Sequence, residues 1–260
     1  MTASIGSLMG TTAAPRTAQC ETHGAFESVN FIGRIWSKCP ACATDLAAKE
    51  KAEQDAREHA GRKAAWEQRL GESCIPERFT DRTLNKFVAS TPEQAHALAF
   101  ATAYADGFAE VLKTGRCAMF VGKPGTGKTH LAAGIALRLM RRDGRPVLFT
   151  TVMRAIRSVK DTWGGNGGKT ETQAIAALVY PDLLILDEVG VQFGSDTEKL
   201  ILFDVLNERY EKRRPTLLLS NLDVEEVEAY LGERIFDRMR EDGGEAVPFE
   251  WESYRGKAHA

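Results

Sequence analysis

The chain has 260 residues, of which 43% are hydrophobic and 27% are charged, as is usual for globular proteins. Its 34 basic and 36 acidic side chains give a net charge of −2, which excludes a uniformly basic nucleic-acid-binding surface and leaves only a local patch for such contacts. No apolar run reaches the roughly 18–20 residues that span a bilayer, and the first residues lack a basic segment before an apolar core. We therefore expect a cytoplasmic protein of one or two domains, without a signal peptide or a membrane contact.

The N-terminal part of the chain divides into three segments by composition: a tail at residues 1–18, a Cys/His-rich module at 19–42 and a linker at 43–74. The tail is rich in Thr, Ala and Ser and is predicted to be disordered, because it cannot bury enough apolar area to offset the entropy of ordering. Within the linker, residues 43–70 are rich in Ala, Glu, Lys and Arg and are predicted to form a helix with a thin apolar stripe. Such a helix is either solvated or binds a partner.

The module at 19–42 contains Cys20-x₂-His23 and Cys39-x₂-Cys42, separated by fifteen residues. Each short pair presents two neighbouring ligands, and the insert can fold back to bring the two pairs together around one ion, as tetrahedral Zn²⁺ requires. This predicts a small zinc-binding module whose folding depends largely on the metal. A redox-active CxxC pair is the alternative.

From about residue 75 onward, short apolar runs alternate with helical runs. The expected strands lie at 117–122, 147–151, 183–188 and 216–221. This alternation predicts an α/β domain over residues 75–260, with a mostly parallel sheet that is flanked by helices on both faces.

The segment GKPGTGKT (122–129) fits the P-loop pattern GxxxxGK[ST] and lies between an expected strand and an expected helix. Its glycines let backbone N–H groups surround the phosphates of ATP, and the helix N-terminus adds partial positive charge. Lys128 is predicted to reach the β- and γ-phosphates and Thr129 to ligate Mg²⁺. The predicted nucleotide contacts are Gly122, Lys123, Pro124, Gly125, Thr126, Gly127, Lys128, Thr129 and His130.

Polar residues that end two other expected strands complete the predicted site. Asp187 and Glu188 follow the apolar run Leu-Leu-Ile-Leu, at the end of a strand where ligands bind in open α/β sheets. Asp187 is expected to hold Mg²⁺ through water, and Glu188 to orient and polarise the attacking water. Asn221 is predicted to contact this water and the γ-phosphate; a turn residue before a helix is the alternative.

Two arginines near the C-terminus are further catalytic candidates. Arg234 shares a face of the helical segment 231–241 with Arg238, four residues later. Exposed arginines on one face are usually solvated, but in an ATPase of this layout Arg234 can enter a neighbour's site as an arginine finger. Arg255, in the sequence WESYR, is expected to reach the γ-phosphate of the ATP that is bound to its own chain.

Taken in order, the segments GKPGTGKTHLA, LLILDEVGVQ, TLLLSNL, LGERIFDRMR and WESYR resemble the DnaC-type helicase loaders of bacteria and phages. These are AAA+ ATPases related to DnaA and to the IstB-like transposition ATPases, and the resemblance covers residues 75–257. It implies that Arg234 is a finger acting in trans and Arg255 a second sensor arginine. It also implies self-association through the ATP site, and delivery of a DnaB-type replicative helicase to single-stranded DNA.

The same resemblance places a DNA-contacting aromatic residue in VKDTWGG (159–165), where this chain has Trp163. An indole face can stack on any base, while Lys160 and Lys169 would attract the phosphates. The alternative is that Trp163 packs locally and that the glycine-rich run after it is a flexible loop.

These observations predict an ATPase that uses ATP, Mg²⁺ and Zn²⁺ and loads a replicative helicase, with the zinc module and the linker helix as candidate helicase contacts. An IstB-like transposition ATPase acting on target DNA is one alternative, and a nucleotide-gated adaptor with little turnover is another. The zinc module and the WESYR segment favour the loader.

Overall fold

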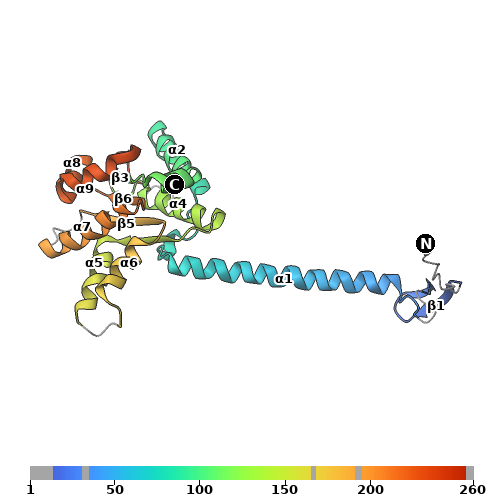
Figure 1. Cartoon of the computed structure of the whole chain (residues 1–260). Coiled ribbons are helices and arrows are strands. Elements are labelled where there is room, and N and C mark those ends of the chain that lie inside the picture. The colour runs from blue at the N-terminus through green and yellow to red at the C-terminus, as the bar shows by residue number, and fades with distance from the viewer. Residues whose placement is uncertain (1–13, 31–34, 165–167, 191–194, 256–260) are drawn as a thin grey trace, which may run out of the picture. The chain divides into compact units, whose positions relative to one another are not determined.

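The computed structural model describes residues 14–30, 35–164, 168–190 and 195–255. Its internal contacts divide the chain into two compact units, Met1–Ala65 and Trp66–Ala260 (Figure 1). The division falls inside helix α1 (Pro40–Glu72), upstream of the boundary at residue 75 that the sequence predicts.

The first unit contains an antiparallel hairpin of β1 (Arg16–Cys20) and β2 (Gly24–Ser28). Its turn ends at Gly24, whose φ of 76° lies in the left-handed region that glycine adopts without strain. Because β1 begins at Arg16, the predicted disordered tail at 1–18 is wrong for its last three residues, whose backbone groups pair with β2. Residues 1–13 lie outside the described residues.

Helix α1 has 33 residues and includes the helix predicted at 43–70. It has no buried residue, in keeping with its polar composition. Near its C-terminal end, Trp66 and Leu70 pack against the core of the second unit, and the Arg141 guanidinium lies 4.5 Å from the centre of the Trp66 ring. Across the described ranges, no helix has both the length and the apolar character that crossing a membrane requires.

The second unit is built on a five-stranded parallel sheet in the order β4-β5-β6-β3-β7. The strands are β3 (Ala118–Gly122), β4 (Val147–Thr151), β5 (Leu183–Val189), β6 (Thr216–Ser220) and β7 (Glu245–Phe249). The four predicted strands are confirmed. The sequence did not predict β7, an edge strand that contains Pro248 and begins with a charged residue, so its pattern is weak.

Successive residues of each strand point to opposite faces of the sheet, and each face is covered by helices (Figure 1). On the Phe120 face these are α2 (Pro92–Asp106), α3 (Phe108–Thr114) and α4 (Lys128–Arg142). On the Met119 face they are α5 (Val152–Lys160), α6 (Glu171–Val179), α7 (Asp196–Glu211), α8 (Val224–Leu231) and α9 (Glu233–Arg240). Short 3₁₀ turns lie at Glu77–Phe79, Leu84–Lys86, Asp161–Gly164 and Glu241–Gly243. The predicted α/β class with helices on both faces is confirmed.

Candidate nucleotide site and metal cluster

The carboxyl ends of the parallel strands border a pocket of 570 Å³ in the second unit. Of the predicted nucleotide and catalytic residues it is lined by Pro124, Gly125, Gly127, Lys128, Thr129, His130, Asp187, Glu188, Asn221 and Arg255. The fold thus brings together residues that are far apart in the sequence, as expected at this edge of an open α/β sheet.

The P-loop adopts a conformation that requires glycine. Gly122, Gly125 and Gly127 have φ values of 114°, 77° and 101°. A Cβ at Gly122 would lie 2.7 Å from the Phe249 carbonyl oxygen, and one at Gly127 would lie 2.7 Å from the Phe87 ring. Only glycine therefore lets the loop turn here and leave its backbone N–H groups accessible to phosphate.

Lys128 begins α4 and is 7% exposed. Its Nζ donates hydrogen bonds to the carbonyl oxygens of Gly122 (2.6 Å) and Lys123 (2.7 Å). Burial lowers the pKa of Lys128 to about 8, although the nearby Asp187 carboxylate opposes this shift. The amine is thus held at the start of the P-loop. A negatively charged ligand at this position would stabilise its protonated form.

Asp187 and Glu188 lie at a bulge near the end of β5. The Thr129 hydroxyl donates to Asp187 Oδ2 over 3.2 Å, and Asp187 Oδ1 accepts from the Glu188 N–H over 2.8 Å. Burial raises the pKa of Asp187. Glu188 has a φ of 62°, a strained conformation for a residue with a side chain, and its side chain is exposed toward the pocket.

The C-terminal segment contacts the P-loop directly. The Trp251 indole N–H donates to the Thr126 carbonyl oxygen (3.0 Å), and the Tyr254 N–H donates to that of Gly125 (2.9 Å). The Tyr254 hydroxyl donates to the Val88 carbonyl oxygen (2.8 Å). These bonds fix the segment before Arg255, which lines the pocket.

Sequence reasoning missed other residues of the pocket. Two groups line it as well: Pro76, Arg78, Phe79 and Arg82 after α1, and Phe149, Thr150, Thr151 and Arg154 around the end of β4. The second group had a usable signal, because the polar Thr150 and Thr151 end an expected strand in the same parallel sheet. The first group had none, because its place depends on how the chain returns to the sheet.

Arg234 does not line this pocket. It is exposed on α9, where its guanidinium lies 5.5 Å from the centre of the Phe203 ring, and it borders a separate hollow beside Glu228 and Arg240. Its companion Arg238 instead lies over the Tyr210 ring. A role for Arg234 in its own chain's nucleotide pocket is therefore not supported.

The predicted DNA contacts lie around the end of α5. Trp163 is 50% exposed, and its indole N–H donates to Glu171 Oε2 over 2.7 Å. The ammonium of Lys160 pairs with Glu198 at 3.1 Å, which partly neutralises it. Lys169 is exposed just before α6. Residues 165–167 of the glycine-rich run lie outside the described residues.

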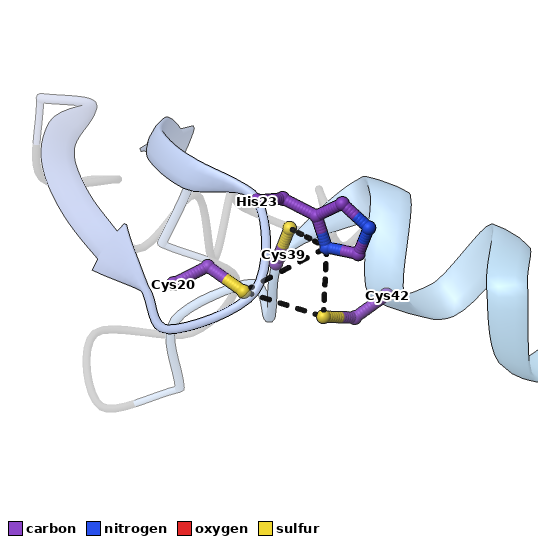
Figure 2. Close-up of side chains that lie close together, drawn as sticks. All are labelled: Cys20, His23, Cys39 and Cys42. Atoms are coloured by element: carbon purple, nitrogen blue, oxygen red, sulfur yellow. Dashed lines mark hydrogen bonds between the residues drawn. The ribbon is translucent and has the colours of Figure 1, made fainter.

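The first unit brings together the four predicted zinc ligands (Figure 2). Cys20 ends β1, His23 lies in the hairpin turn, Cys39 directly precedes α1 and Cys42 lies in its first turn. One ligand atom from each residue lies within 4.8 Å of all the others. His23 Nδ1 is 3.3 Å from Cys42 Sγ and 3.8 Å from the sulfurs of Cys20 and Cys39.

The surroundings of this cluster suit a cation. Hydrogen bonding, chiefly from the backbone of His23, lowers the pKa of the Cys20 thiol to about 6, whereas the hydrogen bond to Cys20 raises the pKa of the Cys42 thiol to about 12. The other ring nitrogen of His23, Nε2, lies 2.9 Å from Asp45 Oδ2. This contact leaves Nδ1 facing the three sulfurs, because a carboxylate that accepts from Nε2 selects the tautomer with a free Nδ1 lone pair.

A P-loop at the end of β3, with an Asp-Glu pair near the end of β5 and an Asn after β6, defines an ATP-binding, ATPase-type domain. Residues 108–260, more than half of the chain, match the family described as IstB-like ATP binding protein. The chain therefore belongs to this family.

Its similar relatives include helicase loaders. The replicative helicase loader DnaC of Escherichia coli K12 is 42% identical over 166 residues, which cover 63% of this chain and 65% of that protein, just under two thirds of its length. The DnaC of Buchnera aphidicola subsp. Acyrthosiphon pisum is 36% identical over 186 residues, or 72% of this chain and 74% of that protein.

A crystal structure of the DnaC helicase loader has the same fold as the second unit. It matches 67% of this chain and 100% of the solved chain, with a TM-score of 0.61 at 21% sequence identity. Together with the family match, this likeness confirms the AAA+ fold expected from the sequence.

Proposed function

We propose that this protein is an ATP-dependent loader of a DnaB-type replicative helicase onto single-stranded DNA. The observation that carries the proposal is the pairing of a pocket that contains the P-loop, the Asp-Glu pair and Asn221 with 36–42% identity to proteins named replicative helicase loader. In this role, ATP binding and hydrolysis would switch the protein between helicase-bound and released states.

The pocket residues have complementary roles in hydrolysis. Lys128 would exchange its two backbone carbonyl partners for the β- and γ-phosphate oxygens of ATP. Glu188 would orient the attacking water and accept its proton, while Asn221 and Arg255 would hold the γ-phosphate. The P-loop N–H groups and the start of α4 would bind the phosphates and hold ATP in position.

The pair Thr129 and Asp187 fits a magnesium ion. Their oxygens are 3.2 Å apart, and hydroxyl and carboxylate oxygens are the ligands that Mg²⁺ prefers. Thr129 would ligate the ion directly and Asp187 through water. When bound, the ion would neutralise negative charge on the β- and γ-phosphates.

The four residues in the first unit fit zinc. In a tetrahedral site with zinc–sulfur bonds of about 2.3 Å and a zinc–nitrogen bond of about 2.0 Å, the nitrogen and sulfur atoms lie about 3.5 Å apart. The separations of 3.3–3.8 Å between His23 Nδ1 and the three sulfurs are close to this value. Three sulfurs and one imidazole form a usual structural zinc set. Because two ligands flank the first turn of α1 and two belong to the hairpin, the ion would join these elements and supply much of the folding energy of this small unit.

Single-stranded DNA would bind at the end of α5. Trp163 exposes half of its surface for stacking on a base, and its bond to Glu171 fixes the ring at its edge without covering its face. The exposed Lys169 supplies a positive charge nearby in sequence, and Lys160 would contribute once a phosphate competes with Glu198.

Arg234 would act in a second copy of the chain. Its exposure on α9 and its distance from its own nucleotide pocket both favour a role between protomers, where it would stabilise charge on the γ-phosphate of a neighbour. The protein would then hydrolyse ATP only when protomers assemble.

The family match favours one competing function, a transposition helper that acts on target duplex DNA. Co-purification separates the two. The full-length tagged chain, with ATP and Mg²⁺, is expected to retain the host's replicative helicase in a complex that survives gel filtration. A stable complex with a transposase, and none with the helicase, would favour the transposition helper.

A further inference from the structure

The nucleotide pocket depends on the turn that follows β6. This turn, Ser220–Leu222, lies where β6 ends and contains the predicted sensor Asn221. Ser220 is 2% exposed and does not line the nucleotide pocket, so it cannot contact ATP. The hydrogen bonds around Ser220 nevertheless join the ends of β3, β5 and β6, which position residues of the pocket.

The Ser220 hydroxyl makes two hydrogen bonds. It donates to the carbonyl oxygen of Val189 over 2.7 Å, and it accepts from the N–H of Leu222 over 3.1 Å. Val189 directly follows Glu188. The hydroxyl therefore joins the backbone just after the proposed water-orienting residue to the backbone just after the proposed sensor.

Leu222 extends this connection. Its carbonyl oxygen accepts from the N–H of Gly122, the first residue of the P-loop, over 3.0 Å. Its side chain fills the space beside Gly190, where an added Cβ would lie 2.2 Å from Leu222 Cδ1. Gly190 has a φ of 85°, a left-handed conformation that favours glycine, and an added Cβ would also displace the Leu222 side chain.

We call the two hydrogen bonds of the Ser220 hydroxyl the clamp. The need for it follows from the strain at Glu188. Its φ of 62° is unfavourable for a residue with a side chain, and the pairing of β5 with β6 is irregular between Leu186 and Val189. Regular sheet pairing therefore does not hold Glu188 in place. Its neighbours do pair in the sheet, Asp187 with Thr151 and Val189 with Ser220. Two side chains also hold the backbone here: the Asp187 carboxylate accepts from the Glu188 N–H, and the Ser220 hydroxyl donates to the next carbonyl oxygen.

We infer that Ser220 is a positioning residue for ATP hydrolysis, which acts by setting the position of Glu188 relative to Asn221 and the P-loop. This inference rests on the proposed ATPase function. A shift of about 1 Å in a catalytic group can lower a rate by about 100-fold. Loss of the Ser220 bonds is thus expected to lower turnover while ATP affinity, which depends on Lys128 and the P-loop, stays nearly unchanged.

The test compares Ser220→Ala and Ser220→Cys, which remove or weaken the hydrogen bonds, with Ser220→Thr, which retains the hydroxyl. Ser73→Ala is the matched control: Ser73 is 1% exposed, its hydroxyl donates to the Leu70 carbonyl oxygen over 2.8 Å, and it accepts from the N–H of Ile75 over 3.4 Å. Each full-length variant is measured for ATP affinity, steady-state ATP hydrolysis (kcat) and amide hydrogen exchange.

We expect kcat to fall at least tenfold in the Ala and Cys variants, with ATP affinity within twofold of the wild type, partial recovery in Ser220→Thr and no loss of kcat in Ser73→Ala. Wild-type kcat in Ser220→Ala, or an equal loss in Ser73→Ala, would overturn the inference. If the wild type has no hydrolysis that depends on Lys128, the proposed ATPase function fails instead. In that case amide hydrogen exchange tests whether Ser220 holds the backbone at Glu188. Faster exchange at residues 188–190 and 222 in Ser220→Ala supports this role, and unchanged exchange overturns it.

Discussion

The Thr129 hydroxyl and the Asp187 carboxylate lie 3.2 Å apart although 58 positions separate them in the sequence. Thr129 lies in the first turn of α4 and Asp187 near the end of β5, so their contact depends on the parallel alignment of β3 and β5 on either side of β6. This relationship places the P-loop and the acidic pair in one site.

Glu188→Gln is expected to retain ATP binding and to lower hydrolysis by at least about 100-fold, in the range given by loss of a general base. The amide keeps the size of the side chain but cannot accept a proton from water. Equilibrium binding of a fluorescent ATP analogue and phosphate release measure the two effects. Lys128→Ala is the contrasting variant, because it should weaken binding itself. Normal turnover in Glu188→Gln would refute the role given to Glu188.

The affinity for ATP should fall as the pH rises above about 8. Burial lowers the pKa of Lys128 to about 8 in the free protein, so the amine loses its charge above that pH, whereas bound phosphates would raise its pKa. Binding at pH 9 must then take up a proton, and affinity is expected to be about tenfold lower than at pH 7. Titration calorimetry in buffers of different ionisation enthalpy measures both quantities.

Lys128→Arg is the control for this pH effect, because a guanidinium keeps its charge throughout this range. Its affinity is expected to be the same at pH 7 and pH 9. The same decrease in the Arg variant would assign the pH dependence to another group.

Much of the nucleotide site could be predicted because its signals are local. The P-loop is a continuous motif, and Asp187, Glu188 and Asn221 each end a strong apolar run in the sequence. Pro76 and Phe79 could not be predicted in the same way, because only the return of the chain to the sheet places them at the pocket. Strand β7 was missed because an edge strand containing Pro248 lacks the pattern of a buried one.

Ser220 shows a further limit. In the sequence it is one polar residue beside Asn221, and its two hydrogen bonds depend on where β5 bulges. The metal cluster, in contrast, can be predicted from the paired spacing of its ligands alone, without any knowledge of the fold. Its histidine tautomer, however, depends on Asp45, which the spacing does not reveal.

The wild-type protein is expected to contain one zinc ion per chain, and Asp45→Asn should lower zinc affinity by about 10–100-fold. The amide does not hold the His23 ring as the carboxylate does, although all four ligands remain. Metal analysis gives the stoichiometry, and competition with a chromophoric chelator gives the affinity. Asp55→Asn, an exposed acid on the same helix, should retain wild-type affinity. Equal affinities in the two variants would remove Asp45 from the site.

Trp163→Ala is expected to weaken binding of single-stranded DNA by about 1–3 kcal/mol, the contribution of one stacked base. ATP affinity should not change, because Trp163 does not line the nucleotide pocket. Fluorescence anisotropy with a labelled oligonucleotide measures the loss. Tyr180→Ala is a suitable control, because Tyr180 is also exposed, at 59%, but follows α6. Wild-type DNA affinity in Trp163→Ala would leave the indole with a local packing role.

The most direct test of the central claim is a helicase-loading assay with purified components. The host's replicative helicase is incubated with circular single-stranded DNA coated with single-strand binding protein, with or without this protein and ATP, and DNA-bound helicase is quantified after gel filtration. We predict that the wild-type protein increases the bound helicase several-fold and that Lys128→Ala does not. Equal amounts of bound helicase with and without the wild-type protein would contradict the proposed loader function.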